Sequence, residues 1–262
     1  MQLSSEQLSQ FHRDGFIVLR GFLDENTCDD ISEVANWHLE EKIEPIETET
    51  EYDERSKEYR TEVTDYTSNS DNQSMAVRRL RQVYDRDSLF KAWMENEKIR
   101  PVLQQVLNDQ VVLTSGHHNS IMTKLPHIST ATAWHQDRRY WRYSDANLLS
   151  IWLALDDEFS QNGVLEFIPG SHKMHLSAEQ FDEKEYLSEA NAVNKEIISN
   201  KVSTKLKKGD VVLFHCLLLH RANKNTTDKA KISFVYTVKG KNTKAEEGTR
   251  SSEFPEIVLK KI

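Results

Sequence analysis

The chain has 262 residues, of which 34 are basic and 42 acidic, so its formal net charge is −8. Binding to nucleic acid over a broad surface needs a basic protein, and we therefore expect no nucleic-acid partner. Mean hydropathy is −0.67, and no run approaches the roughly 18 apolar residues that cross a bilayer, which excludes a transmembrane segment. The start of the chain does not resemble a secretory signal, and Cys28 and Cys216 are too few for a disulfide framework. These features predict a single domain, residues 1–262, in the cytoplasm.

The negative charge is concentrated in one segment. Eleven acidic and only four basic residues lie between Glu40 and Asp65, which leaves the rest of the chain almost neutral. Two interpretations of an acidic insertion at about 40–75 stay open. It is either a solvated, partly disordered segment or a lid over a site.

Helical patterns dominate the first 107 residues. A capped start and apolar spacing predict a helix over 4–14 that ends at Gly15, and a β-rich run, 16–22, follows it. A second helix is expected from Asp24, and a third helical pattern over 87–107 is interrupted near Pro101.

After residue 107 the pattern changes to short β-branched or apolar runs separated by turn signals. We expect strands over 111–114, 120–124, 148–155, 163–168, 211–219 and 232–238. Many short strands at such spacing favour a sandwich, jelly roll or barrel.

One pair of residues has metal-ligand spacing. His135 and Asp137 stand two residues apart, so in an extended strand both side chains project from the same face. A third ligand has to come from elsewhere, and the run 211–220 offers His215 and His220, which alternation places on opposite faces. Two histidines and one carboxylate are the set that non-haem Fe(II) oxygenases use. In the run after 230, Lys231 lies in a strand that reads as buried, where a lysine needs an anionic partner.

Four stretches together resemble the phytanoyl-CoA dioxygenase family of Fe(II)/2-oxoglutarate oxygenases. They are FHRDGFIVLRGFLDENT, WHQD, SIWLALDDEFSQNGVLEFIPGSHK and GDVVLFHCLLLHRANKNTTDKAKISF. The resemblance covers about residues 7 to 238. It implies a mainly β fold with flanking helices, namely the double-stranded β-helix, a cupin-like jelly roll.

The resemblance also implies roles for individual residues. His135, Asp137 and His220 would bind Fe(II), and Trp152, Asn119, Lys231 and Ser233 would contact the co-substrate 2-oxoglutarate. Lys231 is a departure, because most relatives carry an arginine there, and a lysine offers a point charge in place of a planar fork. Ala222 is a second departure, since many relatives have a serine at that position.

The implied reaction is hydroxylation of an aliphatic carbon with O2 as the oxidant. Halogenating relatives replace the carboxylate of the metal site with a small residue, whereas this chain keeps Asp137. Two other interpretations remain open. The chain could be a non-catalytic jelly-roll binding module, or a metal-dependent oxygenase that does not use 2-oxoglutarate.

The segment that follows the metal pair bears on the substrate. Arg139, Tyr140 and Arg142 would lie at the mouth of the pocket and favour a small anionic substrate; alternatively, they belong to a solvated loop that pairs with the acidic segment. His117 and His118 either approach the site from a neighbouring strand or flank a turn after Gly116.

Overall fold

The computed structural model describes residues 1–54 and 76–262, and its strands form two antiparallel sheets. The strands of the larger, major sheet are β1 (Phe16–Leu19), β2 (Ile46–Thr48), β3 (Val77–Arg81), β4 (Val111–Lys124), β6 (Leu148–Ala154), β9 (Val211–His215), β11 (Lys231–Gly240) and β12 (Glu256–Val258). Their order is β1-β9-β6-β11-β4-β3-β2, with β12 beside β4. The minor sheet contains β5 (Thr132–His135), β7 (Leu165–Phe167), β8 (Val202–Ser203) and β10 (His220–Ala222) in the order β5-β10-β7-β8.

Side-chain alternation gives the major sheet two different faces. In β6, Leu149, Ile151 and Leu153 belong to the core beneath the helices, whereas Trp152 and Ala154 belong to the core shared with the minor sheet. This follows from the period of two in a strand. The inner face of the major sheet therefore packs against the minor sheet, which is the expected double-stranded β-helix arrangement.

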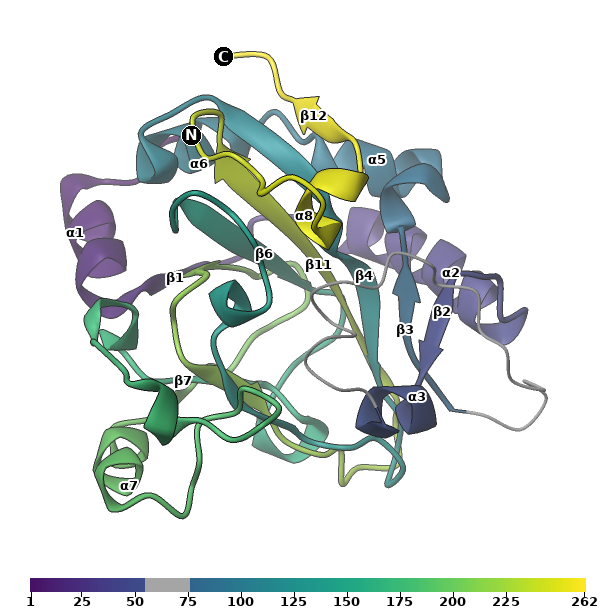
Figure 1. The fold of residues 1–262 in the computed structure, drawn as a ribbon. Coiled ribbons are helices and arrows are strands. Elements are labelled where there is room, and N and C mark those ends of the chain that lie inside the picture. The colour runs from purple at the N-terminus through teal and green to yellow at the C-terminus, as the bar shows by residue number, and fades with distance from the viewer. Residues whose placement is uncertain (55–75) are drawn as a thin grey trace.

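Helices cover the outer face of the major sheet. They are α1 (Ser5–Asp14), α2 (Glu25–Glu40), α5 (Ser88–Met94) and α6 (Arg100–Leu107). Figure 1 shows them around the long strands, whereas α7 (Ala192–Ser199) lies at the end of the molecule that holds the minor sheet. A short helix, α3 (Glu49–Glu54), follows β2, and α8 (Arg250–Glu253) packs on β4. The prediction of a mainly β fold with flanking helices is confirmed.

Two strand predictions are wrong in their boundaries. The run 211–220 is not one strand, because β9 ends at His215 and the chain turns before β10 starts at His220 in the other sheet. The predicted strands 111–114 and 120–124 are the two ends of one strand, β4. Its pairing with β11 shifts from Thr114 to Asn119, so residues 115–118 form a bulge without partners in β11.

The predicted helices are closer to the structure. A Ser4 capping box starts α1, and Gly15 ends it in the left-handed conformation, φ 84°, as its position in the sequence indicates. The pattern over 87–107 is two helices, with Pro101 in the first turn of the second, where its missing N–H costs nothing. No helix in the described parts of the chain is long and apolar enough to cross a membrane.

Candidate metal centre and its cavity

Three predicted ligands meet where two strands of the minor sheet pair. His220, the first residue of β10, lies directly opposite His135, the last residue of β5. Asp137 follows in a 3-10 turn, and its Oδ1 lies 3.7 Å from His135 Nε2 and 3.8 Å from His220 Nε2. All three side chains are buried. The extended conformation of Gln136 keeps Asp137 on the same side as His135, although β5 has already ended.

Backbone carbonyls set the tautomers of both histidines. His135 Nδ1 lies 2.9 Å from the Ala133 carbonyl oxygen, and His220 Nδ1 lies 3.0 Å from that of Leu218. A carbonyl oxygen only accepts, so each Nδ1 carries the hydrogen and each Nε2 keeps its lone pair. Burial lowers the pKa of His220 more than nearby Asp137 raises it, which favours the neutral ring. Two Nε2 lone pairs and one carboxylate oxygen thus converge, as a divalent metal ion requires.

Asp137 is held by two further side chains. Its Oδ1 lies 3.1 Å from His118 Nε2, and its Oδ2 accepts a hydrogen bond from Ser150 Oγ at 2.9 Å. Burial by itself would raise the pKa of Asp137, but its electrostatic interactions with His118 and His220 and the hydrogen bond with His118 outweigh it and hold the pKa well below its ordinary value. The carboxylate is therefore ionised at neutral pH.

The β4 bulge brings His118 to this carboxylate. The sequence left open whether His117 and His118 approach the site, and the structure places both in the cavity wall. His117 Nε2 also bonds to Ser251 Oγ at 2.8 Å. At Gly116 a Cβ would lie 2.9 Å from the Arg250 carbonyl oxygen, so the bulge packs against α8 only because this residue has no side chain. The Gly-His-His run was the only sequence signal for the bulge.

A cavity, called here the site cavity, lies between the two sheets, and its wall includes the three candidate ligands. Of the predicted co-substrate residues, Trp152, Lys231 and Ser233 line it. Trp152 comes from β6, and the other two come from the inner face of β11. Asn119 is not among the lining residues: its Oδ1 accepts from the Tyr84 backbone N–H at 2.9 Å and holds the segment after β3.

The anionic partner expected for Lys231 is Glu158, which was not identified from the sequence. Lys231 Nζ lies 2.9 Å from Glu158 Oε2. Glu158 Oε1 accepts from Ser233 Oγ at 2.6 Å and from Trp152 Nε1 at 2.9 Å. The glutamate side chain is fully buried, so it is one carboxylate in contact with all three co-substrate residues that line the cavity.

Only one of the three predicted substrate residues lines the site cavity as the structure describes it. Tyr140 lines the site cavity and donates its hydroxyl hydrogen to the Lys184 carbonyl oxygen. Arg139 forms an ion pair with Glu185 and its guanidinium lies over the Phe181 ring. Neither Arg139 nor Arg142 is among the described residues of the wall.

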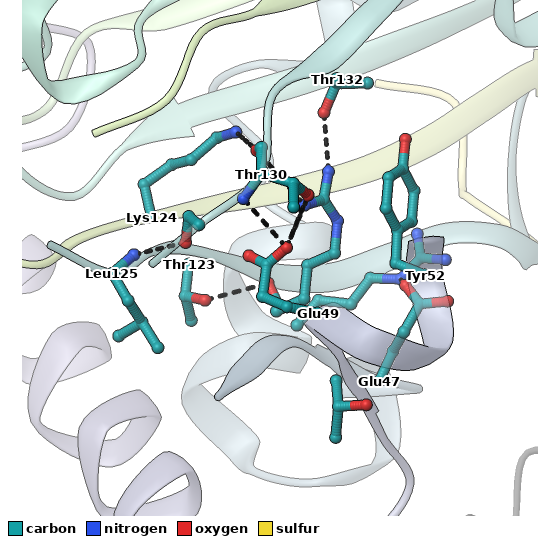
Figure 2. A network of polar contacts seen from close by, with 12 residues as sticks. Glu47, Glu49, Tyr52, Thr123, Lys124, Leu125, Thr130 and Thr132 are labelled. Carbon is teal, nitrogen blue, oxygen red and sulfur yellow. Dashed lines mark hydrogen bonds and ion pairs between the residues drawn. The ribbon is translucent and has the colours of Figure 1, made fainter. Parts of the chain in front are cut away.

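Other basic residues line the cavity, and no motif pointed to them. They are Arg78, Arg79, Lys124, Arg221 and Arg250. Arg78 pairs with Glu49 at 2.7 Å and Arg221 with Glu166 at 2.6 Å. Figure 2 shows Lys124 and Glu49 on either side of Thr130, with Lys124 Nζ donating to the Thr130 carbonyl oxygen at 2.7 Å. Burial and then the charges of Arg78 and Lys231 hold the pKa of Lys124 well below its ordinary value.

The first part of the acidic segment forms part of this wall. Glu49 and Tyr52 both lie in α3, and Tyr52 lines the cavity with its ring 3.5 Å from the Arg78 guanidinium (Figure 2 shows its position). Its hydroxyl lies 2.9 Å from that of Tyr186. The remainder of the predicted insertion or lid, 55–75, lies outside the described residues.

The facing sheets and the His-Asp-His cluster define a cupin-like jelly roll with a candidate metal centre. Residues 11–233 match the sequence profile of the phytanoyl-CoA dioxygenase (PhyH) family, and the chain belongs to that family. It is 24% identical to phytanoyl-CoA dioxygenase domain-containing protein 1 of Bos taurus over 89% of both chains.

Two solved structures show the same fold. EctD from S. alaskensis with bound Fe has a TM-score of 0.76 and 20% identity over 98% of this chain and 87% of its own. The same protein with 2-oxoglutarate and 5-hydroxyectoine has a TM-score of 0.71 and 21% identity, over 93% and 78%.

Proposed function

We propose that the protein is an Fe(II)- and 2-oxoglutarate-dependent dioxygenase that hydroxylates an aliphatic carbon of a small anionic substrate. The observation that carries the proposal is the convergence of His135 Nε2, His220 Nε2 and Asp137 Oδ1 in the wall of a cavity. These residues would hold the iron. Membership of the PhyH family and the Fe and 2-oxoglutarate found with EctD support the choice of metal and co-substrate.

Iron bound there would supply the redox chemistry by which O2 oxidises 2-oxoglutarate to succinate and carbon dioxide and places its second oxygen atom in the substrate. The protein's part is to orient the reacting groups and to exclude water from the cavity. His118 and Ser150 fix both oxygens of Asp137, so the carboxylate cannot rotate away from the histidines. Phe214 and Leu165 give the cavity an apolar wall beside them.

Lys231, Ser233 and Trp152 are the groups proposed to receive the distal carboxylate of 2-oxoglutarate. All three are neighbours on the inner face of the major sheet, where β11 pairs with β6. The ammonium supplies charge, and the hydroxyl and indole supply one hydrogen-bond donor each.

Lys124 supports an anionic substrate. It is buried in the cavity wall, and no described carboxylate lies within ion-pair distance of it. A buried ammonium without a counter-ion is unfavourable, so a carboxylate or phosphate that enters the cavity would be attracted to it. Arg139 and Arg142, expected from the sequence to do this, are proposed only as residues at the periphery of the site.

The test combines absorption spectroscopy with product analysis. Anaerobic addition of Fe(II) and 2-oxoglutarate should produce a weak visible charge-transfer band, and admission of O2 should produce succinate. His135→Gln should lose both signals, whereas His127→Gln, an exposed histidine that pairs with Asp228, should keep both. Iron binding with neither signal would contradict the proposal and favour an oxygenase that does not use 2-oxoglutarate. If the protein also bound no iron, the binding-module interpretation would hold.

A mass-spectrometric screen for products 16 mass units heavier, run with carboxylated and phosphorylated metabolites and, for comparison, with cationic ones, would identify the substrate. A substrate found only among cations would contradict its proposed anionic character.

A further inference from the structure

The contacts of Glu158 bear on how the site recognises its co-substrate. This carboxylate lies where β6 has ended and is fully buried, which is unusual for a glutamate. It accepts hydrogen bonds from Lys231, Ser233 and Trp152, which are the groups proposed to receive 2-oxoglutarate. An internal carboxylate thus already holds the donors that an incoming carboxylate would need.

A count of donors shows how far they are already used. A serine hydroxyl and an indole each have one hydrogen to donate, and Ser233 and Trp152 both give theirs to Glu158 Oε1. An ammonium has three hydrogens. Lys231 directs one to Glu158 Oε2, and its Nζ also lies 3.4 Å from the Gly163 carbonyl oxygen. Only the lysine has a hydrogen left for a ligand.

Charge leads to the same conclusion. The ion pair of Lys231 and Glu158 is neutral as a whole, so the lysine offers little net attraction to a second carboxylate. A ligand carboxylate bonded to Lys231 Nζ would also lie close to Glu158, and two like charges in a buried site repel each other strongly.

We propose that Glu158 is a specificity-determining residue that competes with the distal carboxylate of 2-oxoglutarate for Lys231, Ser233 and Trp152. The inference rests on the proposed function and deepens it. The protein therefore binds 2-oxoglutarate weakly and discriminates little between it and a 2-oxo acid with an uncharged tail. Removal of the negative charge at Glu158 turns the same three groups into a strong carboxylate site.

The test is calorimetric titration of Mn(II)-loaded protein with two ligands, 2-oxoglutarate and 2-oxohexanoate, which has an uncharged tail. Glu158→Gln keeps the size of the side chain and a carbonyl oxygen for Ser233 and Trp152, but it removes the charge. It should lower the Kd for 2-oxoglutarate at least tenfold and leave that for 2-oxohexanoate within about twofold. The matched control is Asp157→Asn, a neighbouring half-exposed carboxylate that pairs with Lys207, and it should change neither value.

If Glu158 instead positioned Lys231 for the co-substrate, Glu158→Gln would raise the Kd for 2-oxoglutarate. An unchanged or higher Kd of Glu158→Gln for 2-oxoglutarate would therefore overturn the inference and leave the proposed function standing. Absence of 2-oxoglutarate binding by all three proteins, with Mn(II) bound, would overturn the proposed function and the inference with it.

A second variant covers the case in which Glu158→Gln does not fold. Glu158→Ala leaves a space beside Lys231 that acetate can fill, so acetate should raise its Kd for 2-oxoglutarate and leave the wild-type value unchanged. Equal effects of acetate on both proteins would count against competition.

Discussion

The hydroxyl of Tyr52 lies 2.9 Å from the hydroxyl of Tyr186, 134 residues further along the chain. Tyr52 stacks on Arg78 in the cavity wall, and the ring of Tyr186 lies edge-on to His135, 6.2 Å between centroids. The pair therefore ties the start of the acidic segment to the side of the cavity that carries the metal cluster.

Because of this hydrogen bond, we expect the effects of substituting the two tyrosines on the free energy of unfolding to be coupled. Tyr52→Phe and Tyr186→Phe each remove one hydroxyl, and a hydrogen bond of this kind contributes about 0.5–1.5 kcal/mol to the free energy of unfolding. Each tyrosine has other contacts, so the single variants alone are insufficient. A double-mutant cycle by urea denaturation should give a coupling of that size, and simple additivity of the two changes would show that the bridge contributes nothing.

Loss of one histidine should greatly weaken metal binding. His220→Gln removes the Nε2 lone pair that the Nδ1 bond to Leu218 leaves free for a metal ion shared with Asp137, and we expect at least about a hundredfold weaker Fe(II) binding. The measurement is metal content after equilibrium dialysis under anaerobic conditions. His127→Gln serves again as the control. A variant at His220 that binds Fe(II) as tightly as the wild type would remove this residue from the ligand set.

Lys124→Met should make the protein more stable and weaken its binding of the anionic substrate. The change removes a buried charge that has no described carboxylate partner, and we expect the free energy of unfolding at pH 7 to rise by about 1 kcal/mol or more. Because folding lowers the pKa of this lysine, the cost of its charge to stability is full below the folded pKa and disappears as the pH rises toward the ordinary lysine pKa. Denaturation curves of the wild type and Lys124→Met at pH 7 and pH 10 test whether the gain in unfolding free energy is larger at pH 7.

The control for this change is Lys224→Met, at an exposed lysine, which should leave both curves unchanged. A fall in stability of Lys124→Met at pH 7 would mean that the bond to the Thr130 carbonyl oxygen outweighs the cost of burying the charge.

His215 should make the protein sensitive to mild acid. Burial, followed by the charge of His172, lowers the pKa of His215 to about 4, and its Nδ1 accepts from the Leu217 backbone N–H. A histidine with a lowered folded pKa contributes fully to stability above the unfolded value of about 6.5, and this contribution decreases as the pH falls toward 4.

The expected loss from this residue between pH 6.5 and pH 4 approaches about 3 kcal/mol. His215→Asn keeps an acceptor for Leu217 but does not titrate, so its unfolding free energy should depend less on pH across that range. The burial of His172 also lowers its pKa, and this neighbour accounts for part of any slope that remains. Equal slopes for the two proteins would exclude His215 as the cause.

Local patterns predicted a β-rich fold and the His135–Asp137 pair, and the family resemblance added the double-stranded β-helix and His220, whereas contacts across the fold could not be read from the chain. Alternation in β11 placed Lys231 and Ser233 on one face, and the spacing of His135 and Asp137 predicted that both bind one metal ion. Glu158 was not foreseen, because a carboxylate in a turn reads as exposed and only the packing of two sheets buries it.

His215 shows a different limit of prediction from sequence periodicity. Continuous alternation over 211–220 placed it and His220 on opposite faces of one strand, but the chain leaves the major sheet between them. An apolar run that changes sheets has the same composition as one that does not, so periodicity could not reveal the turn.

The ladder between β5 and β10 contains only two residue pairs, His220 with His135 and Ala222 with Thr132. So short a ladder has little stability of its own, and a metal ion bound by a histidine from each strand would fasten it as a crosslink does. Iron supply would then set the lifetime of the protein as well as its activity. In an iron-starved cell this ladder would open more readily, and proteases would remove the unloaded chains while loaded ones persist.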